Sequence, residues 1–237
     1  CSQKFSNIYI KYLFSFIITL GIALLLSLQP DIGQTLLVFF SWSVLIFTSG
    51  VSIFLLFFLF SSIILIFFYL IFFVSKFTYI KNRLISFIDS ETGTYNFQSD
   101  KALESITSGG FFGKGIGEGT LKNRVPEAHT DYIISVISEE FGVIAIILIF
   151  LLFLVFIYSV FKKVNFENDE TIKLILVGSV SLILMQTIIH IGVNIRLFPT
   201  TGMTLPFISY GGSSIISISI LSGIILNFTK RNLNQNE

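Results

Sequence analysis

The stretch DYIISVISEEFGVIAIILIFLLFLVFIY, residues 131–158, decides the fold class of this chain. An apolar run of about 20 residues is long enough to cross the roughly 30 Å hydrocarbon core of a bilayer as a helix. Backbone groups in lipid must bond within a helix or a closed barrel, and the alternation typical of barrel strands is absent here. The run therefore predicts a membrane-spanning helix whose three carboxylates, Asp131, Glu139 and Glu140, all lie in its first half.

Five further apolar runs extend this interpretation to nearly the whole chain. Hydrophobic residues make up 53% of the 237 residues and charged residues only 12%, whereas a soluble domain has about 25% charged residues. The turn at Thr48–Gly50 divides two runs that would otherwise form one helix of about 63 Å, which is too long for one crossing. We expect a single all-α domain, a polytopic transmembrane helix bundle with a long external loop at about 76–130 and six spans at about 12–28, 34–49, 51–75, 131–158, 174–195 and 208–228.

Charge and cysteine content exclude several classes of protein. A net charge of +1 without a basic cluster argues against nucleic-acid binding. The single Cys1 excludes a disulfide framework within the chain. The chain therefore offers no sign of a nucleic-acid partner or of a disulfide-rich secreted domain.

Lysine and arginine in short loops set the orientation of the spans. The short loops opposite the termini hold one cation, Arg196. The side that holds both termini carries Lys4, Lys11, Lys162, Lys163, Lys173, Lys230 and Arg231. We therefore expect both termini in the cytoplasm and the loop at 76–130 outside.

The external loop combines a short helix with a glycine-rich segment. SDKALESIT predicts a capped helix that begins at Ser99 or Asp100. Six glycines between residues 109 and 119 allow tight turns, and we expect a flexible hinge there that could gate the entry of a ligand. No strand precedes these glycines, and Lys114 lacks the frame of a phosphate-binding loop, so neither a dinucleotide fingerprint nor a P-loop is predicted.

The segment PEAHTDYIISVISEEFG, residues 126–142, has two interpretations. Thr130 or Asp131 can simply cap the helix that follows. Alternatively, Glu127, His129 and Asp131 form a functional cluster at the mouth of the span, where a carboxylate acting as a general base fits better than a metal site or a nucleophilic triad. The serines of ISVIS are interpreted as packing residues.

Glu139 and Glu140 are expected about 12 Å below the mouth of this span. Ionisable residues inside a membrane are costly and mark a functional or paired role. Successive helical residues point in different directions, so the two acids are expected to have different tasks. We expect one to pair with Arg196 or to face the bundle interior and the other to line a cavity, with a purely structural ion pair as the alternative for each.

Two further polar islands interrupt the apolar runs. Residues 194–214 form either a plain loop or a segment that re-enters and shapes the site, for which Ser209 and Tyr210 are substrate-binding candidates. Helical continuity in this segment is broken by Pro199, Pro206, Gly211 and Gly212. The other island opens with Gln29 and Pro30, and its Asp31 could simply cap the next helix.

His190, within the fifth span, is expected to form a hydrogen bond inside the bundle. It has no obvious partner in the sequence.

Four islands in this order resemble the shape, elongation, division and sporulation family of polytopic membrane glycosyltransferases. They are QPDIG (29–33), SGGFFGKGIGEGT (108–120), PEAHTDYIISVISEEFG (126–142) and FPTTGMTLPFISYGGSS (198–214). Residues 97–132 and 199–214 are most similar to the branch that serves septal wall synthesis, with the elongation branch as the alternative. Members of this family usually have about ten spans, and the motifs match the later six, so we expect the chain to be the C-terminal portion of a longer protein.

The resemblance implies that the protein polymerises lipid II into glycan strands outside the bacterial inner membrane. It assigns the general base to Asp131, which takes a proton from an attacking sugar hydroxyl. Substrate-binding roles then fall on Glu127, His129, Thr130, Ser209 and Tyr210. The departing pyrophosphate needs cations or a divalent metal, Mg²⁺ or Mn²⁺. The candidate cations, by charge and side, are Lys114, Lys122, Arg124 and Arg196.

The resemblance also implies a partner and a place in the cell. The expected partner is a class B penicillin-binding protein, a transpeptidase, together with other division proteins at the division septum. The rival functions are a lipid II flippase or transporter, which suits intramembrane acids, and a non-catalytic scaffold for division proteins. A flippase needs a polar path across the whole membrane, whereas the polar islands of this chain gather on the outer side.

Overall fold

The computed structural model describes residues 8–29, 31–74, 77–88 and 97–231, without the side chains of residues 8–9, 55–56, 63–64, 66–67, 70–71, 122–123 and 231. Within these ranges the chain is helical and has no strand, which confirms the predicted helix bundle. The helices are α1 (Ile8–Leu28), α2 (Ile32–Thr48), α3 (Ile53–Phe73), α4 (Thr78–Ile88), α5 (Phe97–Gly109), the short 3-10 helix η3 (Leu121–Arg124), α6 (Ile133–Val164), α7 (Glu170–Asn194) and α8 (Gly212–Arg231).

The apolar runs correspond to helices whose bounds differ by a few residues from the prediction. Among the described residues, α1, α6, α7 and α8 are long and apolar enough to cross a membrane. α2 is apolar but has only 17 residues, and α3 has 21. The predicted turn between α2 and α3 is confirmed, because Gly50 adopts a φ of +90° and the Ser49 N–H closes the end of α2 on Leu45 O at 3.0 Å.

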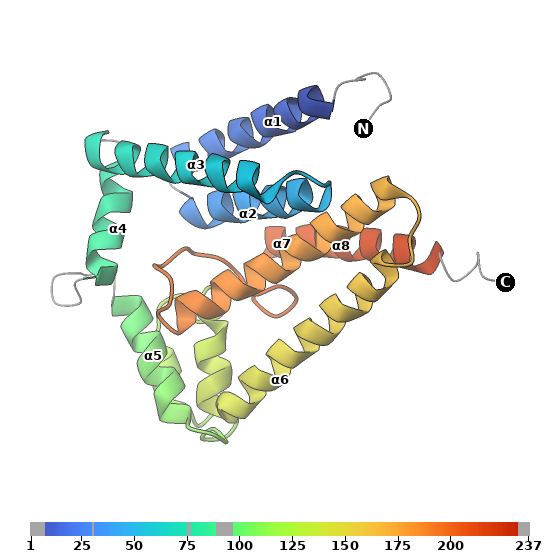
Figure 1. The fold of residues 1–237 in the computed structure, drawn as a ribbon. Coiled ribbons are helices and arrows are strands. Elements are labelled where there is room, and N and C mark those ends of the chain that lie inside the picture. The colour runs from blue at the N-terminus through green and yellow to red at the C-terminus, as the bar shows by residue number, and fades with distance from the viewer. Residues whose placement is uncertain (1–7, 30, 75–76, 89–96, 232–237) are drawn as a thin grey trace.

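α7 occupies the centre of the bundle (Figure 1), where it packs against α2, α6 and α8. Its buried side chains join those of α6 in the main apolar cluster, around Leu176, Val180 and Ile183. The large apolar side chains of α1 and of the later part of α6 are instead mostly exposed, as a lipid-facing surface requires. Central burial and an apolar exterior are thus the arrangement expected of a membrane bundle.

The long segment between α3 and α6 collects at one end of the bundle. The beginning of α1 and the end of α8 lie together at one end, whereas α4 and α5 lie at the other (Figure 1). α5 begins at Phe97, two residues before the predicted start, and Asp100 lies in its first turn. Termini at a common end agree with an even number of crossings; the assignment of that end to the cytoplasm stays a prediction.

α6 is broken at Gly142, which corrects the predicted continuous span at 131–158. Gly142 has φ +79° and ψ 176°, so residues 133–141 and 143–164 form two helical segments that meet at an angle (Figure 1). Only the second segment continues as an uninterrupted apolar helix. Glu139 and Glu140 therefore lie at the end of a short first segment that packs against α5, and not within one continuous spanning helix as expected.

Candidate active site

The end of α7 and the following segment, residues 195–211 (the re-entrant segment), hold the loop that precedes α6. Three consecutive carbonyl groups of that loop accept hydrogen bonds. The bonds run from Tyr210 N to His129 O (3.0 Å), from Ser209 Oγ to Thr130 O (2.7 Å) and from Asn194 Nδ2 to Asp131 O (3.0 Å). These contacts agree with the interpretation that residues 194–214 help to shape the site.

The beginning of α2 joins the same assembly. A Cβ atom at Gly33 would lie only 2.9 Å from Thr201 Cβ and 2.8 Å from Met203 Cγ, so α2 packs directly on the re-entrant segment there. The capping interpretation of Asp31 is confirmed, since its Oδ1 accepts the Gln34 N–H at 3.0 Å. The QPDIG island therefore supports the site from one side.

Asp131 is partly buried beside a polar cavity. This cavity has a volume of about 360 Å³. It is lined by Arg83, Phe97, Gln98, Pro126, Asp131, Tyr132, Thr200 and Gly202. No cation among the described residues forms an ion pair with the Asp131 carboxylate. The carboxylate is thus neither neutralised by a fixed partner nor sealed from solvent.

The surroundings of Asp131 make it more basic than an ordinary aspartate. Burial raises the pKa of the Asp131 carboxyl group, the negative charge of Glu127 raises it further, and a hydrogen bond from Thr130 opposes the rise in part. Because a base whose pKa lies nearer the operating pH accepts a proton more effectively, this environment suits proton abstraction.

The prediction that Thr130 or Asp131 caps α6 is wrong. Tyr132 is the residue that precedes the helix, and no side chain caps it. Instead, the N–H groups of residues 130–132 converge on the carbonyl oxygen of Glu127, at 3.1–3.3 Å. Glu127 adopts a φ of +54° to form this turn, and the turn leaves the Asp131 carboxylate available for another task.

A second, larger cavity is lined by other residues of the same loop. It has a volume of about 660 Å³. Its lining residues are Val125, Glu127, Ala128, His129, Thr130, Val136, Glu140 and Tyr210. The structure therefore brings together four of the predicted substrate-binding residues here, and it confirms that one of the two helix acids, Glu140, lines a cavity.

Glu139 is fully buried and joins three separate segments. Its carboxylate accepts hydrogen bonds from Ser105 Oγ of α5 and from the Leu121 N–H of η3, both at 3.0 Å. Lys114 Nζ of the glycine-rich segment lies 3.3 Å from the same carboxylate. The expected pairing with Arg196 is wrong, because Arg196 pairs with Asp100 of α5; the interior position of Glu139 is confirmed.

The predicted pyrophosphate-binding cations whose side chains are described, Lys114, Arg124 and Arg196, do not line the cavity of Asp131. Lys114 and Arg196 are engaged in the ion pairs just described, and Arg124 is exposed on η3. The Lys122 side chain lies outside the described residues. The cation that shares a cavity with Asp131 is Arg83, which the sequence reasoning missed.

Arg83 belongs to α4 and reaches the re-entrant segment. Its Nη1 donates to Thr200 O at 2.9 Å, and its guanidinium group lies 4.3 Å from the centre of the Tyr79 ring. Arginine has five N–H donors and is always charged, and Arg83 lines the cavity of Asp131. No local signal marks Arg83, because its partner Thr200 is 117 residues away in the sequence.

The glycine-rich segment is packed against the break in α6, contrary to the expected flexible hinge. The N–H groups of Lys114 and Gly115 donate to Glu139 O and Glu140 O, while the Val143 N–H donates to Gly110 O. The loop thus satisfies backbone groups that the break would leave unpaired. A Cβ atom at Gly113, where φ is +79°, would lie 2.2 Å from Glu140 O, so glycine serves close packing at this position.

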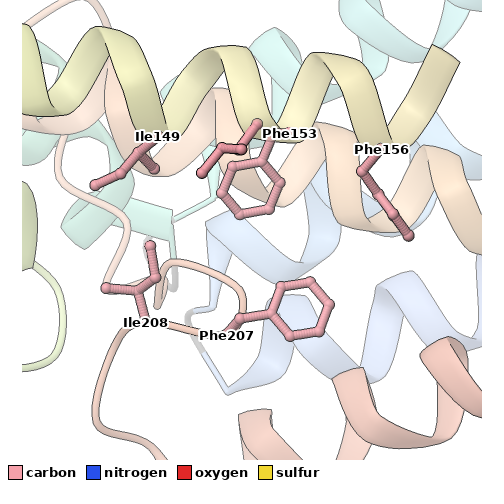
Figure 2. A pocket seen from close by; sticks show the side chains of 6 residues that line it. Ile149, Phe153, Phe156, Phe207 and Ile208 are labelled. Atoms are coloured by element: carbon pink, nitrogen blue, oxygen red, sulfur yellow. The ribbon is translucent and has the colours of Figure 1, made fainter. Parts of the chain in front are cut away.

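An apolar cavity borders the re-entrant segment on the side of the second segment of α6 (Figure 2). It has a volume of about 310 Å³. It is lined by Ile149, Leu152, Phe153, Phe156, Phe207 and Ile208. Phe207 and Ile208 directly precede Ser209, which bonds the loop of the candidate base, so the apolar cavity and the polar end share one turn of the chain.

The remaining predicted positions have structural surroundings. Gln29 is exposed at the end of α1, and Pro30 lies outside the described residues. Pro206 is fully buried, whereas Pro199 is partly buried. Gly211 and Gly212 lie at the start of α8. Ser135 and Ser138 are buried, as their packing interpretation expects.

No ready-made metal centre occurs in the described part of the chain. No three His, Cys, Asp or Glu side chains there are grouped to hold an ion. His190 is buried and its Nδ1 forms a 2.7 Å hydrogen bond with Met203 O, which confirms the expected bond inside the bundle. The arrangement therefore places a carboxylate of raised pKa beside a cavity, on a loop that is bonded to the segment lining the apolar cavity.

Comparisons with known proteins agree over almost the whole chain. A family model described as a cell cycle protein, FTSW_RODA_SPOVE, matches residues 2–234. The chain is 36% identical over 225 residues to a probable peptidoglycan glycosyltransferase FtsW of Caulobacter vibrioides, covering 95% of this chain and 56% of that protein. A protein of the same description from Wigglesworthia glossinidia brevipalpis is 36% identical over 231 residues, which cover 95% of this chain and 60% of that protein.

Two solved structures share the fold. One, from work on structural coordination of polymerization and crosslinking by a peptidoglycan synthase complex, gives a TM-score of 0.78 at 25% identity and covers 97% of this chain and 64% of that chain. The other is an aspartate-to-alanine mutant of the rod shape determining protein RodA of Thermus thermophilus, with a TM-score of 0.58 at 25% identity over 95% of this chain and 57% of that chain. The chain thus spans little more than half the length of the relatives that it matches.

Proposed function

The chain belongs to the FtsW, RodA and SpoVE family of cell cycle proteins, and from this premise we propose that it polymerises lipid II as a peptidoglycan glycosyltransferase of cell division. Its apolar helices and its family make it a multi-pass membrane protein. The single observation that carries the proposal is Asp131, a partly buried carboxylate with a raised pKa, beside a polar cavity at the end of the bundle where the loops gather.

In the proposed reaction Asp131 is the general base. It takes the proton from the 4-hydroxyl group of one sugar while that oxygen attacks the anomeric carbon of the other, lipid-linked sugar. The bond from this carbon to the pyrophosphate breaks, the electron pair leaves with the lipid pyrophosphate, and the anomeric configuration inverts. A positioned base of this kind contributes about 10²- to 10⁴-fold to the rate.

The two cavities that residues of the Glu127–Asp131 loop line suit the two sugars that must meet at the base. Arg83, in the cavity of Asp131, is the described cation best placed to receive the negative charge that develops on the pyrophosphate. The apolar cavity beside Phe207 and Ile208 (Figure 2) suits part of a polyprenyl tail, because burial of apolar surface is favourable in proportion to its area.

The site is compatible with a divalent cation that binds together with the substrate phosphates. The described residues offer no three-ligand cage, but Mg²⁺ is commonly held by one or two carboxylates together with substrate phosphates. Glu127 or Glu140 in the larger cavity would be the protein ligands of a Mg²⁺ or Mn²⁺ ion that arrives with the pyrophosphate. Bound there, the ion would neutralise phosphate charge.

A lipid II flippase is the second function considered, and the buried polar groups of α7 argue against it. Ser179, Ser181 and Thr187 donate to carbonyl groups of their own helix, at 2.8–2.9 Å. Within the described helices these groups therefore line no polar path through the bundle. The polar groups that line the two cavities instead gather at one end, where surface chemistry would occur.

Partners and location follow from the same proposal. We propose a class B penicillin-binding protein as the crosslinking partner and the bacterial inner membrane at the division septum as the location, with both termini of this chain in the cytoplasm. Support comes from the structural neighbour that was solved in work on the coordination of polymerization and crosslinking by a peptidoglycan synthase complex. A role as a non-catalytic scaffold is the alternative, and an assay of lipid II polymerisation distinguishes it from a polymerase.

The proposal is tested with the protein expressed at its natural length, alone and with its transpeptidase. Purified protein is incubated with lipid II, and glycan strands are resolved on a gel; proteoliposomes carrying a fluorescent lipid II analogue report transbilayer movement in parallel. Strand formation without transbilayer movement supports the polymerase. Transbilayer movement without strands supports a flippase, and neither activity with the partner present supports a scaffold.

A further inference from the structure

We infer that Asn194 and Ser209 are positioning residues for the Asp131 base: they hold the backbone around it by side-chain hydrogen bonds to consecutive carbonyl groups. The inference rests on the proposed function, in which Asp131 takes a proton. It concerns residues of α7 and the re-entrant segment that touch neither cavity.

Every backbone group next to the base is engaged. Inside the loop, the N–H groups of residues 130–132 all donate to Glu127 O. Outside it, Thr130 O accepts from Ser209 Oγ at 2.7 Å, and Asp131 O accepts from Asn194 Nδ2 at 3.0 Å. Asp131 precedes α6 and so gains no rigidity from a helical ladder. Asn194 and Ser209 are therefore the two side chains that tie this loop to α7 and to the re-entrant segment, in addition to its backbone hydrogen bonds.

Each of the two side chains is itself fixed by a second hydrogen bond. Asn194 is fully buried, and its Nδ2 also donates to His190 O at 2.9 Å, one turn back on the central helix α7. Ser209 is 4% exposed, and its Oγ also accepts the Leu205 N–H at 2.8 Å. The hydroxyl donor of Ser209 is consumed by Thr130 O, so its predicted role in substrate binding is replaced by a role in holding the loop.

Loss of either bond should displace the base without removing it. A misplacement of about 1 Å caused by a change away from the chemistry can cost about 100-fold in rate. Asn194→Leu and Ser209→Ala each delete one bond, whereas Ser209→Thr retains the hydroxyl group. Gln186→Leu is the matched control, since Gln186 Nε2 holds the same re-entrant segment at Thr204 O (2.9 Å) but does not bond the loop of the base.

The experiment measures initial rates of lipid II polymerisation per folded molecule, in protein of natural length with its partner, across pH. We expect Asn194→Leu and Ser209→Ala to lower the rate at saturating lipid II about 10- to 100-fold with an unchanged KM. The acid limb of the pH–rate profile of both variants should move to lower pH. A loosened loop admits water to Asp131, and this lowers the pKa of its carboxyl group. Ser209→Thr should restore both properties. The charged or titratable groups that face Asp131 are Glu127, Arg83 and Tyr132, and all three are kept in every variant.

Hydrogen exchange of the peptide that covers residues 127–136 gives a readout that does not depend on activity. Faster exchange there in Asn194→Leu and Ser209→Ala, but not in Gln186→Leu, supports the inference. Rates that fall only in proportion to the folded fraction, with an unchanged pH profile and unchanged exchange, would overturn it. An Asp131→Asn variant that polymerises at the wild-type rate would instead sink the proposed function, whatever the exchange result.

Discussion

Replacing Glu139 by alanine should destabilise the packing of α5, η3 and the glycine-rich segment around the break in α6. The change removes a fully buried carboxylate that accepts hydrogen bonds from Ser105 Oγ and the Leu121 N–H, both at 3.0 Å, and from Lys114 Nζ at 3.3 Å. A hydrogen bond to a charged group contributes about 1.5–3 kcal/mol, so the two shorter bonds together contribute about 3–6 kcal/mol.

The ion pair with Lys114 adds little free energy to this sum, and the desolvation of the buried Glu139 carboxylate subtracts from it. The Lys114 side chain is 37% exposed and can turn to water after the substitution, so its pairing is worth at most about 1 kcal/mol. Because no buried charge is left behind, we take the lower end of the hydrogen-bond sum, about 3 kcal/mol, as the expected loss for Glu139→Ala. Glu139→Gln keeps the shape and an acceptor oxygen, and it should cost about 1–3 kcal/mol.

The assay is denaturant titration in mixed micelles, followed by circular dichroism, with limited proteolysis of residues 110–124 as a local readout. Glu118→Gln is the control, because Glu118 is an exposed carboxylate of the same glycine-rich segment and surface changes usually stay within about 0.5 kcal/mol. If Glu139→Ala unfolds at the same denaturant concentration as Glu118→Gln, with no new cleavage, Glu139 does not hold the three segments together.

Three further predictions use the same preparations. Gly142→Ala should lose at least about 2 kcal/mol of stability, because a φ of +79° costs a non-glycine residue about 1–2 kcal/mol and its Cβ would lie 2.1 Å from Phe111 O. The control Gly223→Ala has open space around its Cβ and should not be destabilised. Equal stability of the two variants would contradict the break in α6 at Gly142. Glu127→Gln should move the acid limb of the polymerisation rate to lower pH, because Glu127 raises the pKa of Asp131; an unmoved limb would show that another group titrates. Asp131→Asn should keep or raise the melting temperature at pH 7, because burial disfavours the ionised carboxylate. This gain in melting temperature should vanish at a pH below the ordinary aspartate pKa. A marked fall in the melting temperature at pH 7 would mean that the Asp131 side chain has a structural role.

The features that could be predicted from the sequence are those that local chemistry determines. The lengths of the apolar runs gave the helices, and the turn between α2 and α3 followed from the length limit on one crossing. The Asp31 cap depends on a residue only three positions away. The polar islands were recognised as one site by their order, and the structure brings them to one end of the bundle.

The features that sequence reasoning missed depend on distant partners. A glycine within an apolar helical pattern is usually tolerated, so Gly142 gave no warning of a break. Its stabilisation comes from a loop about 30 residues earlier, through Gly110 O. Arg83 lies beside Asp131 only because α4 reaches the re-entrant segment, and Glu139 meets Lys114 across 25 residues. Spacing along the chain carries no trace of such contacts.

The most direct test of the central claim is the rate at which purified Asp131→Asn protein, of natural length and with its partner, converts lipid II into glycan strands. The substitution keeps the size of the side chain and removes its ability to accept a proton. We expect the rate to fall about 10²- to 10⁴-fold with lipid II binding retained. A rate within a few-fold of the wild type, in a variant that is folded and bound to its partner, would contradict Asp131 as the base.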